Sequence, residues 1–393
     1  MTRIDVGGLV EPGWEPVRAA FEKNFELGEE IGASTAVYHR GHKVVDIWGG
    51  EFDETGDRPY DDSTLQVVFS TTKGIVAIAV AMCVERGLID YDEKVATYWP
   101  EFAAHGKGEA TVAQLMSHQC GLIAPDVPVS LADMLDWKTM TAMLADTKPD
   151  WPIGSGHGYH AVTYGWLAGE LIRRTDGRTP GRFVAEEIAG PLGVDLWIGL
   201  PEEFEPRVSP VIGSLAGSDA TPPHVRAMMQ MFLGPDTRAG RALMMNGAYG
   251  IDDDWINTRA IHAAEIPAAN GITDGAALAK VYAATLSSVD GVRLLSEETV
   301  ERARATITPA GEPDLCLIMP TTFGMGFMTH GIFTPYSGPG SFGHSGAGGS
   351  NAFAQPERQL AVGYVMNKMA ANLATDARAQ RVSDAAAAVA DSL

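Results

Sequence analysis

The first fifty residues show two patterns of apolar positions. From Trp14 to Phe25 an apolar side chain recurs at every fourth position with charged residues between, which predicts an amphipathic helix. Residues 34–39 and 43–48 are rich in β-branched and aromatic side chains and are joined by Arg40-Gly41-His42, an arrangement typical of a β-hairpin. We therefore expect the chain to begin with a helix that packs on a hairpin.

The far end of the chain repeats this arrangement. Residues 351–355 and 359–366 flank a turn that contains Pro356, and the Ala-rich stretch 376–390 predicts a helix. Strand patterns are scarce in between, where helices are predicted over 74–86, 112–118, 164–174, 180–188 and 276–286. Matching ends around a helical centre predict an α+β fold, in which both termini build an antiparallel sheet flanked by helices and a mostly helical domain is inserted.

Two domains follow from this organisation. Residues 1–85 and 270–393 are predicted to form the α/β sheet domain and residues 86–269 the mostly helical domain, with the active site in the cleft between them. Part of the cleft wall is expected from the segment 201–272, whose paired methionines are more often core filler than substrate contacts.

Composition and charge narrow the class of protein. The 393 residues carry a net charge of −21, which disfavours nucleic acid and anionic membranes as partners. The longest nearly uncharged apolar run, 74–84, is too short to span a bilayer, and the first residues lack the apolar core of a signal peptide, so we expect a cytoplasmic location. Cys83, Cys120 and Cys316 stand in no paired motif, which fits isolated buried side chains in a reducing compartment.

The segment from Phe69 to Val80 carries the most informative chemistry. Ser70 and Lys73 stand three residues apart at the start of a predicted helix, so their side chains share one face and can touch. That helix is apolar on all sides until Glu85 and is closed by Gly87, which predicts its burial, and burial lowers the pKa of a Lys. A neutral amine beside a hydroxyl is a general base, and the helix N-terminus favours negative charge on Ser70.

The spacing alone does not establish a nucleophile. With 18 Ser and 9 Lys in the chain, chance gives roughly 0.4 Ser-x-x-Lys matches, and Ser70 could serve only as the N-cap of the helix. The position at the head of a buried helix favours the catalytic interpretation.

Further motifs follow in order along the chain: Thr111 to Leu122 (TVAQLMSHQCGL), Tyr159 to Gly165 (YHAVTYG), Phe323 to Phe327 (FGMGF) and Gly343 to Gly346 (GHSG). Together with Ser70-x-x-Lys73, these segments resemble the motifs of the serine β-lactamase and penicillin-binding-protein superfamily, closest to class C β-lactamases and family VIII carboxylesterases. The resemblance covers nearly the whole chain and implies the β-lactamase/transpeptidase-like form of the α+β fold, with a strand at residues 323–327.

The resemblance also assigns catalytic roles. It implies that Ser70 is the nucleophile, that Lys73 and Tyr159 are the general acid/base pair, and that the backbone N–H groups of Ser70 and Ala347 form the oxyanion hole. A Lys ammonium is expected to favour the phenolate of Tyr159. Without the resemblance, the favoured interpretation of Tyr159 is a core side chain whose hydroxyl finds a partner. The implied reaction needs no cofactor and no metal.

Substrate contacts are implied for His344, Ser345 and Gly346, in a Gly-rich run where an edge strand is expected to start. The same run also has the plain interpretation of a strand entry with loose turns. Two departures from the lactamase pattern point to neutral esters: Tyr159-His160-Ala161 stands where many members have Tyr-x-Asn, and His344 replaces the Lys that would pair with a β-lactam carboxylate.

Two other interpretations of these segments are weaker. Residues 343–347 come close to the G-x-S-x-G nucleophile elbow but lack its final Gly and its strand–turn–helix context. His157 and His160 lack the spacing of a helical zinc motif.

We therefore predict a serine hydrolase that cleaves short-chain carboxylic esters through an acyl-enzyme on Ser70. A β-lactamase or D-amino-acid peptidase or amide hydrolase with the same residues, an acyltransferase, and a catalytically silent scaffold of the same fold are the alternatives. The expected partner is a small-molecule ester, without nucleic acid or membrane, and homo-oligomerisation is left open.

Overall fold

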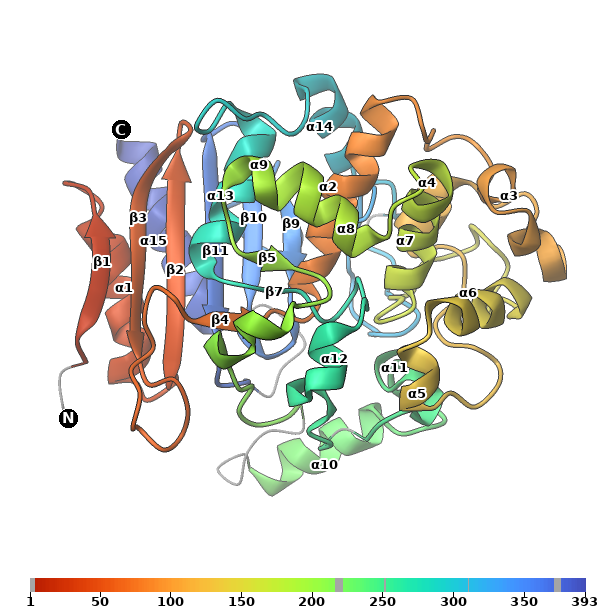
Figure 1. Cartoon of the computed structure of the whole chain (residues 1–393), viewed down its shortest axis with the longest axis horizontal. Helices are drawn as coiled ribbons and strands as arrows, with labels where there is room; N and C mark the ends of the chain where they lie inside the picture. The colour runs from red at the N-terminus through yellow and green to blue at the C-terminus, as the bar shows by residue number, and fades with distance from the viewer. Residues whose placement is uncertain (1–3, 216–221, 251, 310, 371–375) are drawn as a thin grey trace.

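The large sheet of the computed structural model is antiparallel and has seven strands in the order β1-β3-β2-β11-β10-β9-β8 (Figure 1). The structure describes residues 4–215, 222–250, 252–309, 311–370 and 376–393. The strands are β1 (Val6–Val10), β2 (Gly32–His39), β3 (His42–Gly50), β8 (Met328–Thr329), β9 (Phe342–Ser345), β10 (Asn351–Gln355) and β11 (Leu360–Met366). Strand β2 from the first fifty residues pairs directly with β11 near the end of the chain, so the prediction of a sheet built from both termini is confirmed.

Helices cover both faces of this sheet. They are α1 (Glu15–Glu26), α2 (Thr71–Glu85), α13 (Gly275–Leu286), α14 (Glu297–Arg304) and α15 (Ala377–Ser392). Neighbouring residues of β11 show which helix lies on which side: a Cβ on Gly363 would meet backbone atoms of α13, whereas the Tyr364 ring lies 6.3 Å from that of Phe21 in α1. Helix α15 packs against α1, so the two terminal helices form one layer, and α13 lies on the opposite face with α2 beside it (Figure 1).

The segment between α2 and α13 is mostly helical, as predicted. Its helices are α3 (Val95–Tyr98), α4 (Val112–Met116), α5 (Leu131–Met134), α6 (Trp137–Asp146), α7 (Tyr164–Thr175), α8 (Pro180–Val184), α9 (Gly190–Leu192), α10 (Pro223–Phe232), α11 (Arg238–Leu243) and α12 (Arg259–Ala263). A small second sheet in the order β5-β7-β4-β6 combines strands from both predicted domains: β4 (Leu65–Val67), β5 (Leu196–Trp197), β6 (Val208–Ser209) and β7 (Ile272–Thr273). This sheet ties the inserted helices to the turn that precedes α2.

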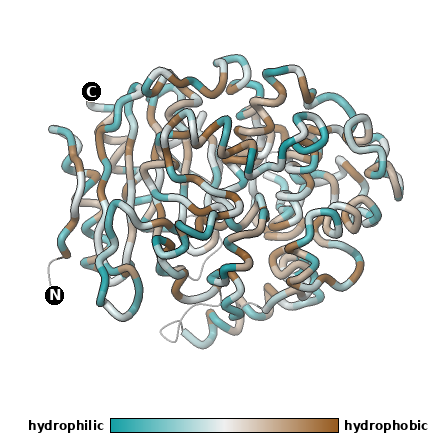
Figure 2. Tube along the Cα trace, viewed as in Figure 1, coloured by the Kyte–Doolittle hydropathy of each residue, from teal (hydrophilic) through white to brown (hydrophobic). Residues whose placement is uncertain are grey.

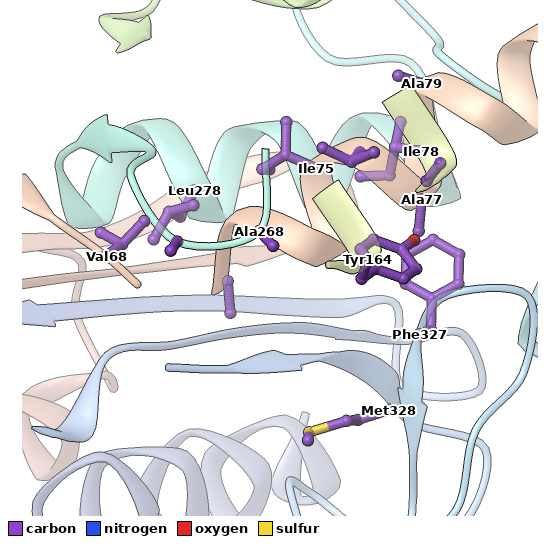
Figure 3. Close-up of a cluster of buried hydrophobic side chains, with 14 of the residues drawn as sticks. Val68, Ile75, Ala77, Ile78, Ala79, Tyr164, Ala268, Leu278, Phe327 and Met328 are labelled. Atoms are coloured by element: carbon purple, nitrogen blue, oxygen red, sulfur yellow. The ribbon is translucent and has the colours of Figure 1, made fainter. Parts of the chain in front are cut away.

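Helix α2 lies at the centre of the core. Every residue from Thr71 to Cys83 is buried, because the helix packs between the sheet on one side and α7 and α8 on the other. Figure 3 shows part of the cluster around it, with side chains from α2, α7, α13 and β8, among them Ile75, Ile78, Tyr164, Leu278 and Met328. The hydrophobic stretches in Figure 2 run along the strands and inner helices, while the outer loops are mostly hydrophilic. A helix buried on all sides is a rigid support for the residues at its N-terminus.

Three details differ from the sequence predictions. Strand β1 precedes the first helix and was not predicted, because its sequence VGGLV has two Gly and no clear alternation. The expected strand at 323–327 is a turn closed by a bridge from Phe323 to Met328, since Gly326 has φ +90° and a Cβ there would meet the Tyr164 hydroxyl. The Gly-rich run 343–349 begins inside β9, which is not the expected edge strand, because β9 lies between β10 and β8.

The three cysteines are buried and unbridged, as predicted. Among the residues that the structure describes, none of the helices combines the length and the apolar composition needed to cross a bilayer.

Candidate active site

Ser70 lies in the turn that leads from β4 into α2. It occupies the N-cap position of α2, but its side chain makes no capping hydrogen bond, so the hydroxyl is not used to hold the helix. Phe69 before it has φ +44°, a left-handed conformation that is costly for a residue with a Cβ. Thr72 fixes this turn, because its hydroxyl donates to Phe69 O at 2.6 Å and accepts the N–H of Gly271 at 2.9 Å.

Lys73 is completely buried one turn into α2. Its Nζ lies 2.9 Å from Ser70 Oγ, 2.6 Å from Ala161 O and 2.9 Å from Ala268 O. Burial holds the pKa of Lys73 well below its usual range, which favours the neutral amine. A neutral amine has two N–H donors and one lone pair. The two carbonyls accept the two donors, so the lone pair is left for the Ser70 hydroxyl, which is the geometry of a general base.

Tyr159 lies on the loop before α7 and contacts both of these residues. Lys73 Nζ lies 4.9 Å from its ring centroid, and Tyr159 and Ser70 line the same cavity. We expected a Lys ammonium to favour the phenolate, but burial raises the pKa of the Tyr159 hydroxyl above its usual value of 10 while it lowers that of Lys73. Burial therefore favours the neutral form of both groups, an amine that can accept a proton and a phenol that can donate one.

A buried carboxylate that the sequence did not single out holds the Tyr159 loop. Asp314 Oδ1 accepts the backbone N–H groups of Tyr159 at 3.1 Å, Cys316 at 2.8 Å and Leu317 at 2.9 Å, and Oδ2 accepts the Thr321 hydroxyl at 2.9 Å. Asp314 stands 155 positions from Tyr159, and no motif surrounds it. Only the folded arrangement brings the two together.

The histidines near Tyr159 form hydrogen bonds with the backbone of neighbouring segments. His160 donates its backbone N–H to Nδ1 of His118 at 3.2 Å, and its Nε2 accepts the N–H of Leu122 at 2.9 Å. Nε2 of His157 lies 3.1 Å from the backbone oxygen of Thr321. The motif at 111–122 thus supports the loop that carries Tyr159.

The structure separates the predicted substrate-binding residues. Ser345 and Gly346 line the cavity at Ser70, but His344 is fully buried behind Tyr159, with the two rings stacked at 6.0 Å, and does not line it. Side chains alternate along β9, so His344 points toward α2. Its Nδ1–H donates to Ser345 O at 2.7 Å, and burial holds its pKa well below the usual value. His344 is therefore a neutral ring that backs the tyrosine.

The loop of Ala347 follows β9 and reaches the turn of Ser70. A Cβ on Gly346 would lie 2.3 Å from Val68 O, so only a glycine permits this approach. The next residues are held from the C-terminal end: buried Arg378 donates to Gly348 O and pairs with Asp376 at 2.8 Å. Ala347 and Ser70 border the same cavities, where their N–H groups are predicted to form the oxyanion hole.

Two cavities meet at Ser70. The larger, which we call the large chamber, has a volume of about 690 Å³, and the smaller, the small chamber, about 40 Å³. Residues 210–215, 243–244 and 249–257 line the large chamber where the structure describes them, which confirms the prediction that the segment 201–272 shapes the cleft. Met244 is part of that wall. Among the described residues, neither chamber is lined by a Lys, Arg or His side chain.

Comparisons with known proteins agree with this arrangement. The family model described as Beta-lactamase matches residues 17–387. Esterase/beta-lactamase LipL of Mycobacterium tuberculosis is 35% identical over 373 residues, which cover 93% of this chain and 83% of that protein. The crystal structure of a family VIII carboxylesterase superposes with a TM-score of 0.86 at 36% identity and covers 98% of this chain and 100% of its own. A penicillin-binding protein homolog from Caulobacter crescentus does so with a TM-score of 0.85 at 38% identity and the same coverage.

Proposed function

The chain belongs to the beta-lactamase family, and from this premise and the geometry around Ser70 we propose that it is a serine carboxylesterase. The observation that carries the proposal is the contact set of Lys73: two backbone carbonyls and the Ser70 hydroxyl surround a buried amine whose pKa is lowered. This arrangement supports removal of the Ser70 proton at neutral pH.

In the acylation step, Ser70 Oγ forms a bond to the ester carbonyl carbon while its proton passes to Nζ of Lys73. The carbonyl oxygen takes the electron pair, and the N–H groups of Ser70 and Ala347 stabilise the resulting oxyanion. The tetrahedral species then breaks its C–O bond to the alcohol. Tyr159 gives its phenolic proton to the leaving oxygen and takes the proton held by Lys73, so the alcohol leaves neutral.

Deacylation reverses these proton transfers with water as the nucleophile. Tyr159 and Lys73 take a proton from water while its oxygen forms a bond to the acyl carbon. The bond to Ser70 Oγ then breaks, the serine regains its proton, and the carboxylic acid leaves. No step in this sequence requires a cofactor.

The pocket chemistry favours esters over β-lactams. A β-lactam carboxylate needs a cation, yet His344, which stands where lactamases carry a Lys, is buried with a lowered pKa. Neither chamber offers another cationic side chain among the residues described. A neutral ester leaves no charge unpaired in the site, which supports carboxylic esters as substrates.

The test is the mass of the intact protein after treatment with a fluorophosphonate. We expect one covalent adduct on the wild-type protein and none on Ser70→Ala. Ser345→Ala is the matched control, because Ser345 lines the same small chamber and would be the nucleophile of an elbow motif; it should keep its adduct. Equal labelling of wild type and Ser70→Ala would overturn the proposal, and turnover of a chromogenic cephalosporin at the rate of a short ester would favour a β-lactamase instead.

A further inference from the structure

The two chambers share the residues where the reaction takes place. Ser70, Leu243 and Ala347 border both cavities, so a carbonyl carbon bonded to Ser70 Oγ, with its oxygen at the N–H groups of Ser70 and Ala347, lies at their junction. An ester carbonyl has two substituents, the acyl chain and the alkoxy group. Each substituent must then enter a different chamber.

Tyr159 distinguishes the chambers because it borders only the small one. The group that protonates the leaving oxygen must lie within hydrogen-bond reach of it, about 2.6–3.2 Å between heavy atoms. The alkoxy oxygen is therefore directed toward the Tyr159 side of Ser70, and the acyl chain is directed into the large chamber.

We propose that the enzyme selects esters of small alcohols with larger apolar acyl groups. This inference rests on the proposed function, in which Tyr159 is the general acid. It changes the prediction of short-chain esters, because only the alcohol must be short, whereas the acyl chain can be long.

The sizes and walls of the chambers support this division. At about 40 Å³ the small chamber has room for two or three heavy atoms beyond the ester oxygen, if each needs a volume like that of a water site, about 10–15 Å³. Its outer walls are Leu317, Met328 and Phe333, all of which are buried. Close-packed core side chains move little to admit a longer alcohol.

The large chamber is built for an apolar chain. Its volume of about 690 Å³ is that of an ordinary ligand pocket, and its lining contains many apolar side chains, including Val162, Ile212, Met244 and Trp255. Its carboxylates are Asp53, Glu54 and three consecutive Asp at 252–254, of which only Asp53 is partly buried. The apolar side chains of the wall favour an apolar acyl chain.

A pair of isomeric esters tests the assignment. Methyl octanoate and heptyl acetate have the same formula, but the long chain is on the acyl side in the first and on the alcohol side in the second. We expect kcat/KM, measured by acid release at constant pH, to be at least about tenfold higher for methyl octanoate, since misplacing even one methylene costs about tenfold or more.

Two variants should each lower the ratio of kcat/KM for methyl octanoate to that for heptyl acetate, one through each chamber. Met328→Ala enlarges the small chamber and should raise kcat/KM for heptyl acetate. Ile212→Trp fills the large chamber and should lower kcat/KM for methyl octanoate, and because Ile212 is only half-buried, this variant keeps the test valid if Met328→Ala does not fold. The matched control is Leu9→Trp, which places the same ring on exposed β1 and should leave the ratio unchanged.

The outcomes separate this inference from the proposed function. Absence of fluorophosphonate labelling at Ser70 together with absence of ester hydrolysis overturns the proposed function. Labelling of Ser70 with equal rates for the two esters, with a preference for heptyl acetate, or with turnover of neither ester overturns the chamber assignment alone. A preference for methyl octanoate that falls in both variants supports it.

Discussion

At the scale of single residues, the burial of Lys73 and Tyr159 sets where the protons lie. Burial disfavours the charged form of each group, so it lowers the pKa of the amine and raises that of the phenol. Both shifts favour the neutral forms, in which Lys73 can accept a proton and Tyr159 can donate one. The shift is a property of the folded core around α2, which a free peptide with the same motif would lack.

This state predicts the pH profile of the enzyme. As pH falls, Lys73 gains a proton and can no longer act as base, so kcat/KM for methyl octanoate should fall on the acid side only. From neutral to mildly alkaline pH it should stay flat, because the raised pKa of Tyr159 delays loss of the phenolic proton. Circular dichroism at each pH excludes unfolding as the cause of the acid limb. A second limb just above neutrality would mean that Tyr159 ionises there, against this account.

Asp314 is predicted to act on catalysis through the position of Tyr159. In Asp314→Ala three backbone N–H groups lose their acceptor, including that of Tyr159, and the loop is free to shift. A displacement of about 1 Å can cost about 100-fold in rate, so we expect kcat to fall by about 10- to 100-fold. KM should change less than kcat, because Asp314 lines neither chamber and only Leu317, among the residues whose N–H groups it accepts besides Tyr159, lines the small one.

Rescue by a similar side chain distinguishes positioning from stability. Asp314→Asn keeps an oxygen that can accept the three N–H groups and should retain most of kcat, although it presents an amide to the Thr321 hydroxyl. Unfolding curves in urea for all three proteins show whether lost activity follows lost structure. If Asp314→Ala remained folded and as active as wild type, the positioning role would be wrong.

At the scale of elements, the loop after Asp314 contains a strained residue. Ile318 has φ +61°, and a β-branched side chain in the left-handed region is unfavourable. Its side chain is 71% exposed, so its removal sacrifices little packing. We expect Ile318→Gly to raise the free energy of unfolding by about 0.5–1 kcal/mol, the left-handed penalty less the added flexibility of Gly. Urea unfolding measures the difference.

A nearby isoleucine offers the control for this prediction. Ile332 is 83% exposed but does not have a positive φ, so Ile332→Gly should lower the free energy of unfolding. If both substitutions destabilised the protein equally, strain at Ile318 would not be the reason for its effect.

The sequence predicted elements well where the pattern is local. The hairpin, the helix headed by Ser70 and the terminal strands follow from periodicity and turn residues, and the structure confirms them. Strand β1 was missed because its pairing with β3, rather than its own composition, makes it a strand. The turn at 323–327 was missed because the close approach of Tyr164 decides its backbone. Contacts between distant segments cannot be predicted from the local sequence pattern.

The same limit applies to the site. The Ser-x-x-Lys motif predicted the contact between Ser70 and Lys73, since both are on one helix turn. Asp314, the carbonyl of Ala268 and the anchor Arg378 could not be found, because each acts through a backbone group far away in sequence. Almost any residue can supply a backbone donor or acceptor, so a motif, which is a pattern of side-chain types, cannot identify it.

At the scale of the whole molecule, segments from along the entire chain meet at one site. The proposed nucleophile Ser70 directly precedes α2, the proposed acid Tyr159 comes from the inserted helical segment, and the Ala347 loop follows the C-terminal strand β9, where Arg378 of α15 holds it. Helix α15 in turn packs against α1. The termini therefore support the Ala347 loop as well as the sheet.

The protein has a net charge of −21, and its large chamber is lined by five carboxylates and, among the described residues, by no cation. We expect the large chamber to repel acyl groups that end in a negative charge. Monomethyl glutarate and methyl 5-methylhexanoate have the same shape, but the first ends in a carboxylate and the second in an isopropyl group, so kcat/KM should be at least about tenfold lower for the anion at low salt. Added KCl screens exposed charges beyond a Debye length of about 10 Å at 0.1 M, so the difference in kcat/KM between the two esters should narrow with salt while the rate for the neutral ester is unaffected.

Asp252→Asn combined with Asp254→Asn should narrow the same difference in kcat/KM without salt, because both side chains are exposed on the chamber wall. Equal values of kcat/KM for the two esters at low salt would show that the carboxylates of the large chamber do not repel the bound acyl group.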